Sequence, residues 1–268
     1  MSTITPDRYG PWALVAGASE GIGASFARQL AAQGINLVLV ARREGPLDAL
    51  AGDLRDGHGV ETRVVSLDLS ARGAEANLFA ATADLEVGLL IYNAGADEHA
   101  ATFLDVTVDE WAAMVRRNCA IPLLAAHHYG RGMVDRGRGG VLLVTSGAAW
   151  AGGGRLATYG ATKAFDLVLG EALWAEWRGH GVDVLSLVVG ATATPALHRL
   201  LNQQGTTLDG LAEPDDVARA GLEHLAEGPT WSMGMPDGGG GSPFDGLSRR
   251  DAVLAMTAGG DMTFGPPT

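Results

Sequence analysis

A glycine-rich turn close to the start of the chain limits the folds that this sequence can adopt. An apolar run typical of a buried strand covers residues 12–16, and a helical pattern follows from about 24 to 33. Between them stands the motif Gly17-Ala-Ser-Glu-Gly21-Ile-Gly23. Glycines here allow a tight turn and a close approach to a pyrophosphate, which the free amides and positive end of the next helix attract. We therefore predict dinucleotide contacts at Gly17, Ser19, Gly21, Ile22 and Gly23.

Apolar runs and helical patterns alternate along the rest of the chain. The runs predict strands at residues 35–40, 62–67, 87–92, 141–145 and 182–189, and the helical patterns lie near 46–55, 72–83, 107–131, 156–178, from 214 onward and at 248–257. Such alternation predicts a parallel sheet with right-handed crossovers. No linker divides the chain, so we predict a single α/β domain over residues 1–268, with a doubly wound parallel sheet flanked by helices on both faces. Pro122 predicts a kink in the long helical stretch near Asn118.

The composition argues against several classes of function. Hydrophobic residues make up 47% of the 268 residues, which suits a sheet covered on both faces. A net charge of −12 argues against nucleic acid, which requires basic patches. Cys119 is the single cysteine, so intrachain disulfides are excluded and no metal site is expected. Without a membrane-spanning run or a signal peptide, the chain is expected to be cytoplasmic and to make no membrane contact.

Tyr159 and Lys163 are the most informative pair of side chains. They stand four residues apart in the helical pattern at 156–178, so they share one helix face. Lys163 is the single lysine beside 18 arginines. An ammonium group near a tyrosine favours the phenolate, and a tyrosine so tuned can exchange a proton with an alcohol or ketone oxygen. Ser146 follows the strand at 141–145, at the carboxyl end where ligands bind, and Trp150 in the next loop is a candidate wall residue of the substrate pocket.

Two arginines follow the second predicted strand, where many NAD sites place an acidic residue that binds the ribose 2′-hydroxyl. Arg42 and Arg43 instead predict a grip on the 2′-phosphate of NADP, with Ser19 adding a hydroxyl group. Glu20 would repel that phosphate unless an arginine neutralises it. The sequence therefore predicts NADP(H) as the cofactor, with NAD(H) as the alternative.

Together these motifs resemble those of the short-chain dehydrogenase/reductase family over roughly residues 10–230. The matching elements are Gly17-x-x-x-Gly21-x-Gly23, Asn93-Ala-Gly95, Asn118, Ser146, Tyr159-x-x-x-Lys163 and the segment from Gly190 to Thr194. The resemblance implies a Rossmann-type fold and a nicotinamide cofactor. It also implies oxidation or reduction at a carbinol or carbonyl carbon.

The resemblance implies roles for individual residues as well. Tyr159 would be the acid/base, and Ser146 would polarise the substrate oxygen. Lys163 would bind the nicotinamide ribose and favour the tyrosine phenolate, and Asn118 would hold a water molecule in the proton path. The cofactor-binding positions that it adds are Asp68 at the adenine, Thr194 at the carboxamide, Asn93, Gly95, Tyr159, Gly190 and Thr192.

The segments after the sixth predicted strand are less regular. Residues 190–213 are predicted to form an irregular or weakly helical lid, and residues 238–241 a flexible turn. Residues 229–268 look unlike the family's common last strand, so we regard them as an atypical tail. The mainly apolar lid favours a small hydrophobic carbonyl substrate, with steroids, acyl thioesters, aromatic ketones and sugars all left open.

Two other functions fit the same fold. A cofactor-binding sensor or scaffold would keep the fold without the chemistry, but it would not need Ser146, Tyr159 and Lys163 together. An epimerase or dehydratase would need a larger substrate domain than the short region after Gly190 allows.

Assembly is the last expectation from the sequence. Helices that carry more than one apolar stripe usually bury the second against a partner. The helical stretches at 107–131 and 156–178, with Trp174 and Trp177, show this pattern. We therefore predict a homodimer or homotetramer.

Overall fold

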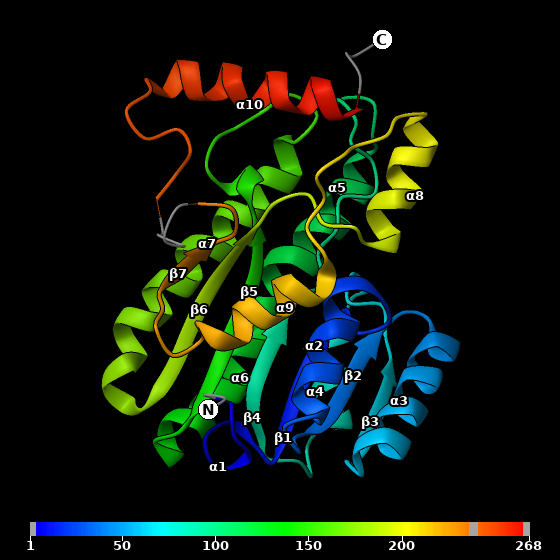
Figure 1. Cartoon of the computed structure of the whole chain (residues 1–268), viewed down its shortest axis with the longest axis vertical. Coiled ribbons are helices and arrows are strands. Elements are labelled where there is room, and N and C mark those ends of the chain that lie inside the picture. Colours follow the sequence, from blue (N-terminus) through cyan, green and yellow to red (C-terminus); the bar gives the residue numbers. More distant parts are fainter. Residues whose placement is uncertain (1–3, 236–240, 265–268) are drawn as a thin grey trace.

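A computed structural model describes residues 4–235 and 241–264. Within these residues, seven parallel strands form one sheet in the order β3-β2-β1-β4-β5-β6-β7 (Figure 1). The strands are β1 (Trp12–Ala16), β2 (Asn36–Ala41), β3 (Thr62–Ser66), β4 (Val87–Tyr92), β5 (Gly139–Ser146), β6 (Val182–Val189) and β7 (Thr230–Ser232). The order reverses between β1 and β4, and ligands bind at the carboxyl ends of strands beside such a reversal.

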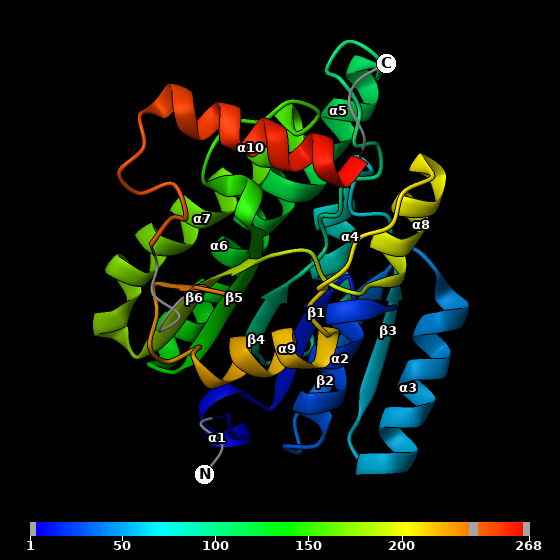
Figure 2. The same ribbon diagram turned by 45° about the horizontal axis from the view of Figure 1, so that its top comes forward.

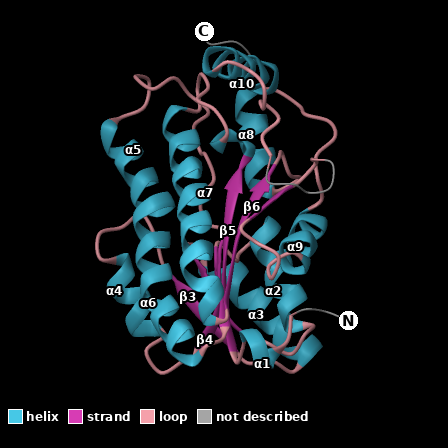
Figure 3. Cartoon of the chain, turned by 90° about the vertical axis from the view of Figure 1, so that its left-hand side faces the viewer, coloured by secondary structure: helices cyan, strands magenta, loops and turns pink. Residues whose placement is uncertain are grey.

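Helices cover both faces of the sheet (Figure 3). One layer holds α2 (Gly21–Ala31), α3 (Glu44–His58) and α9 (Pro214–Glu223), and the other holds α4 (Ala74–Ala81), α5 (Val108–Val115), α6 (Ile121–Arg136) and α7 (Ala157–Trp177). Alternate strand residues face the two layers, so Val15 lies in one core and its neighbour Leu14 in the other. This two-sided burial explains the apolar strands, and the predicted single α/β domain with a doubly wound parallel sheet is confirmed.

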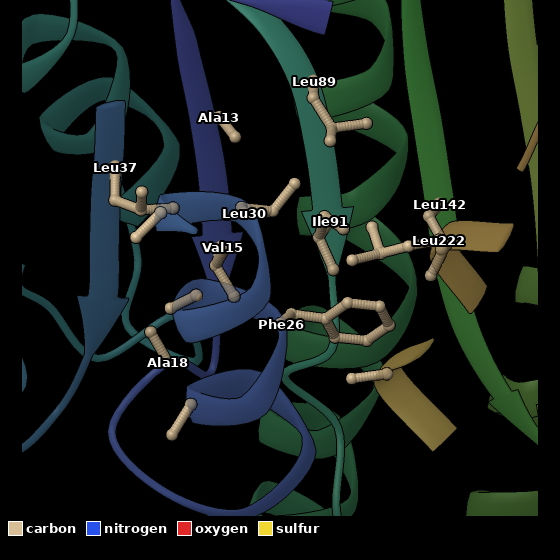
Figure 4. Packing of buried hydrophobic residues seen from close by; sticks show 14 of the residues in the cluster. Ala13, Val15, Ala18, Phe26, Leu30, Leu37, Leu89, Ile91, Leu142 and Leu222 are labelled. Carbon is tan, nitrogen blue, oxygen red and sulfur yellow. The ribbon is translucent and has the colours of Figure 1, made fainter. Parts of the chain in front are cut away.

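Packing between α2 and the sheet centres on Phe26 (Figure 4). Phe26 and Leu30 point from α2 toward Val15 of β1 and Ile91 of β4, and Leu222 of α9 lies in the same cluster. The Phe26 side chain is fully buried, and burial of a phenylalanine stabilises a fold by about 1.5–3 kcal/mol. This packing fixes the direction of α2, whose first turn carries the glycine motif.

Strand β7 corrects the expectation for the end of the chain. It pairs in parallel with β6 and extends the sheet, in a region that the sequence left without a strand. A strand of three residues is too short to show the alternation by which strands are recognised.

The last helix, α10 (Arg249–Phe264), also differs from its prediction, since it continues past residue 257. Gly259 and Gly260 disfavour a helix. Gly260 is nevertheless buried beside the Gly154 carbonyl, so packing against that loop outweighs the local preference. Of the turn predicted at 238–241, residues 238–240 lie outside the described part of the chain.

The long stretch around Asn118 contains two helices joined by a π-helical turn, η1 (Arg116–Ala120). Asn118 lies in this turn. The π turn is an irregularity at the predicted position, and Pro122, which lacks an amide hydrogen, follows it directly in the continuous helical run. The lid at 190–213 contains a regular helix, α8 (Pro195–Gln204).

Helix α3 offers a matched test of two glycines. A Cβ at Gly52 would meet nothing closer than 4.0 Å, and the residue is helical, so Gly52→Ala should raise the free energy of unfolding by about 1 kcal/mol. Gly59 also faces open space, but its φ is +69°, so Gly59→Ala should lower the free energy of unfolding by about 1–2 kcal/mol. Denaturant unfolding checks both, and equal effects in the two variants would contradict this account.

Candidate active site

A cavity of about 850 Å³ opens at the carboxyl ends of the strands, between the loops after β1 to β6 and the helices α8 and α10. Most of the predicted site residues line it: Gly17, Ser19, Gly21, Ile22, Arg42, Arg43, Asp68, Asn93, Gly95, Ser146, Tyr159, Lys163, Gly190, Thr192 and Thr194. Gly23 and Asn118 lie behind this wall. Trp150 is not part of the wall, and its carbonyl accepts a hydrogen bond from Arg249 of α10 at 3.0 Å.

The three glycines of the turn stand at positions that do not accept a side chain. Gly17 and Gly21 have φ values of +83° and +56°, which L-residues rarely adopt. A Cβ at Gly23 would lie 2.0 Å from the Gly17 carbonyl oxygen. Glu20, the N-cap of α2, makes no side-chain cap, so the first amides of the helix are not satisfied by it. An anionic pyrophosphate fits this cradle, because the helix presents free donors and the positive end of its dipole.

Lys163 is held from behind by two acceptors. Its side chain is 4% exposed, and Nζ donates to the Val144 carbonyl at 2.9 Å and pairs with Asp166 Oδ2 at 3.3 Å. The Lys163 carbonyl also accepts from the Thr145 hydroxyl at 2.6 Å, which ties α7 to β5. These contacts fix the ammonium group at the cavity wall, on the same helix face as Tyr159.

Asn118 is fully buried behind Lys163 and Tyr159. Its amide nitrogen donates to Thr162 Oγ1 at 3.0 Å and to the Gly95 carbonyl at 3.5 Å, and its oxygen accepts from Arg117 Nε at 3.1 Å. The same Thr162 hydroxyl donates to the Tyr159 carbonyl at 2.8 Å. The side chain of Asn118 therefore joins η1, the β4 loop and α7, and its predicted water-holding role stays a prediction.

Charged pairs surround the opposite end of the cavity. Arg42 Nη2 lies 2.6 Å from Glu98 Oε1, while Glu20 pairs with both Arg43 and Arg199. Hydrogen bonds from Arg199 and Arg43 lower the pKa of the Glu20 carboxyl, although burial opposes them. Arginines therefore neutralise the charge of Glu20. This is the condition under which the sequence analysis expected a phosphate to bind at this end of the cavity.

Arg199 is a site residue that the sequence reasoning missed. It lies on α8 and reaches Glu20 across a separation of 179 residues. The sequence contained little indication of this role, because an arginine in an amphipathic lid helix usually faces solvent. Thr194 lies on the cavity wall, and its hydroxyl also caps α8 by accepting from Leu197 N at 3.2 Å, so its contact with the carboxamide stays a prediction.

Helix α10 forms the other part of the wall that the sequence did not predict. In Figures 1 and 2 it crosses over the loop between β5 and α7. Gly154 N donates to Thr257 Oγ1 at 3.0 Å, and Arg155 Nη1 donates to the Phe264 carbonyl at 2.9 Å. The cavity residues from this region are Phe244, Ala255, Met256, Gly259, Gly260, Thr263 and Phe264. They make this end of the cavity mainly apolar, beside Ser146 and Tyr159.

Among residues 4–235 and 241–264, no three His, Cys, Asp or Glu side chains cluster to hold a metal ion. The helices that the structure describes include none with the length and apolar character needed to cross a membrane.

Comparison with known proteins places these features in a family. The family model for short chain dehydrogenase matches residues 11–205. A 7beta-hydroxysteroid dehydrogenase of Collinsella aerofaciens is 40% identical over 191 residues, which cover 71% of this chain and 72% of that protein. A solved structure from a study of 7beta-hydroxysteroid dehydrogenase stereoselectivity is 33% identical, with a TM-score of 0.84 and coverage of 96% of this chain and 99% of that chain.

A second solved structure, a short-chain dehydrogenase from Sphingobium yanoikuyae in complex with NADPH, is 30% identical with a TM-score of 0.75. It covers 83% of this chain and 87% of that chain. The match of the family model over most of the chain agrees with the sheet order and with the glycine turn. The chain therefore belongs to the short-chain dehydrogenase/reductase family of oxidoreductases.

Proposed function

We propose that this protein is an NADP(H)-dependent oxidoreductase that interconverts a keto group and a secondary alcohol on a steroid. The observation that carries the proposal is the position of Ser146, Tyr159 and Lys163 in one cavity, between an arginine-lined end and an apolar end closed by α10. The similarity to 7beta-hydroxysteroid dehydrogenases supports a steroid whose reacting oxygen is at position 7. The NADPH complex of a structural relative supports the cofactor.

Ser146 and Tyr159 would carry the proton transfer. Ser146 Oγ accepts from Ala148 N at 3.2 Å, so its O–H would donate to the substrate oxygen. Tyr159 would give its phenolic proton to that oxygen in reduction and take it back in oxidation. The nicotinamide cofactor, when bound, supplies or accepts the hydride. The Lys163 ammonium would stabilise the phenolate that remains.

The remaining site residues would hold the cofactor. The glycine turn with Ser19 and Ile22 would receive the pyrophosphate, while Arg42 and Arg43 would bind the 2′-phosphate. The other positions that we assign to the cofactor are Asp68, Asn93, Gly95, Lys163, Gly190, Thr192 and Thr194. Helix α8, within the lid at 190–213, would cover the cofactor, because Leu197, Arg199 and Leu200 of this helix line the cavity.

The proposal is tested with a panel of ketones. NADPH consumption would be followed with a 7-oxo bile acid, a 3-oxo steroid, a 3-oxoacyl thioester and an aromatic ketone, and the products separated by chromatography. We expect the 7-oxo compound to have the highest kcat/KM. Preference for the thioester or the aromatic ketone would overturn the substrate class. Tight NADPH binding without consumption on any ketone would favour the alternative, a catalytically silent binding protein.

Exposed apolar side chains on α5 to α7 support the predicted homo-oligomer. Val115, Leu123, Leu124, Phe165 and Val168 are all exposed, and Val168 is 61% exposed. Trp174 and Trp177, expected on the same surface, instead pack against the core of their own chain, where a Cβ on Gly130 would touch the Trp177 ring. The assembly face that we propose therefore excludes both tryptophans.

Light scattering at micromolar concentration should give the mass of a dimer or tetramer. Val168→Glu should lower that mass, because a charge on this face would lose its water in the interface. Leu254→Glu places the same charge on exposed α10 and should leave the mass unchanged. A monomer mass for the unsubstituted protein would refute the prediction.

A further inference from the structure

Asp166 is a buried carboxylate that no step of the mechanism uses. It lies one helical turn beyond Lys163 on α7 and is 1% exposed. Its Oδ2 atom lies 3.3 Å from Lys163 Nζ. Its Oδ1 atom is buried and has no hydrogen-bond partner within residues 4–235 and 241–264. An isolated buried carboxylate is costly, so this group depends on the lysine for compensation.

The groups around Asp166 come from three elements besides α7. Tyr92 of β4 and Cys119 of η1 both feel its charge, which adds to burial in raising the pKa of each side chain. Arg117 of η1 acts on Tyr92 in the opposite sense. Ser186 of β6 donates to the Leu167 carbonyl at 3.1 Å and supplies no charge. Among the described residues, Lys163 is the one cation that the structure sets against this carboxylate.

Lys163 consequently divides its hydrogen bonds between the interior and the site. Of its three N–H groups, one serves the Val144 carbonyl and one serves Asp166, which leaves one for the cavity. An ionised Asp166 cancels part of the field that the ammonium exerts on Tyr159. A neutral group at the same position would leave that field complete.

We propose that Asp166 is a positioning residue for the catalytic pair: it anchors the Lys163 ammonium from behind and, through its own charge, limits how strongly that ammonium favours the Tyr159 phenolate. The proposal rests on the proposed function, in which Tyr159 is the acid/base. Burial raises the pKa of the Asp166 carboxyl to about 6, with Lys163 opposing the rise. The Asp166 carboxyl is therefore easier to protonate than an exposed one.

The test replaces the charge and keeps the shape. In Asp166→Asn the lysine faces a neutral amide, so the phenolate is favoured more strongly. Alcohol oxidation needs the phenolate, and its rise in kcat/KM with pH should move to lower pH by about one unit, the smallest shift typical of one neighbouring charge. Glu176→Gln removes an equal charge from the exposed side of α7 and should not move the profile.

A second readout needs neither substrate nor cofactor. The ultraviolet absorbance of tyrosinate, titrated in the protein alone and corrected with Tyr159→Phe, should show the same shift in Asp166→Asn. Asp166→Ser offers a smaller neutral replacement and should behave likewise if the asparagine variant does not fold. The proposal would be overturned if Asp166→Asn lowered kcat but left both the pH dependence of kcat/KM and the tyrosinate titration unchanged. Asp166 would then have only a structural role. If Tyr159→Phe itself turned over the substrate at a near-normal rate, the proposed function of Tyr159 as the acid/base would be refuted instead.

Discussion

Replacing Tyr159 by phenylalanine should lower kcat by ~10²-fold or more, because the substitution keeps the ring and deletes the proton that the reacting oxygen receives. The backbone around it should not change, since the Tyr159 carbonyl and the Thr162 hydroxyl keep their hydrogen bond. Cofactor binding should also persist, because the glycine turn and the arginines lie at the other end of the cavity. NADPH fluorescence measures binding, and steady-state kinetics measure turnover.

Tyr129→Phe is the matched control for this variant. The Tyr129 hydroxyl lies 2.8 Å from Thr82 Oγ1 under α6, away from the cavity wall. Its loss should lower the free energy of unfolding by about 1 kcal/mol and leave kcat unchanged. Near-normal turnover in Tyr159→Phe would show that another group supplies the proton, and the assignment of the acid/base would then be wrong.

The parts of the site that the sequence predicted are those that local structure determines. Gly17 and Gly21 follow β1 directly, so a strand, a turn and a helix are enough to place them. Tyr159 and Lys163 share a helix face whatever the rest of the chain does. Ser146 ends β5, and the carboxyl ends of parallel strands meet at one edge of the sheet. No tertiary contact had to be known for these predictions.

The parts that were missed depend on contacts between distant segments. Arg199 reaches Glu20 only because α8 folds back over the glycine turn, and α10 joins the wall through a hydrogen bond between Arg155 and Phe264 across 109 residues. No periodicity in the sequence encodes such pairings. Asp166 was missed as well, because an acidic residue on a helix is usually exposed, and its burial here follows from packing against β4, η1 and β6.

The choice between NADPH and NADH depends on the end of the cavity that Arg42, Arg43 and Arg199 line. Arg42 is exposed at its pair with Glu98, so a phosphate can replace that carboxylate at little cost. Glu20 is held by Arg43 and Arg199, which reduces its repulsion of a phosphate. One charge-assisted bond from arginine contributes roughly 1.5–3 kcal/mol, so the enzyme should prefer NADPH over NADH by about tenfold to hundredfold in kcat/KM.

Arg42→Ala should therefore lose most of this preference, through a lower kcat/KM with NADPH and little change with NADH. Arg55→Ala is the control, because Arg55 bonds to Thr62 on the outer side of α3 and lies outside the cavity wall. It removes the same net charge, so any loss that it shares with Arg42→Ala reflects the overall field of the protein rather than contact with the phosphate. Both cofactors are to be measured with one ketone at fixed ionic strength, since screening weakens exposed pairs. A preference for NADH in the unsubstituted enzyme, or an unchanged ratio in Arg42→Ala, would show that the 2′-phosphate does not bind at Arg42.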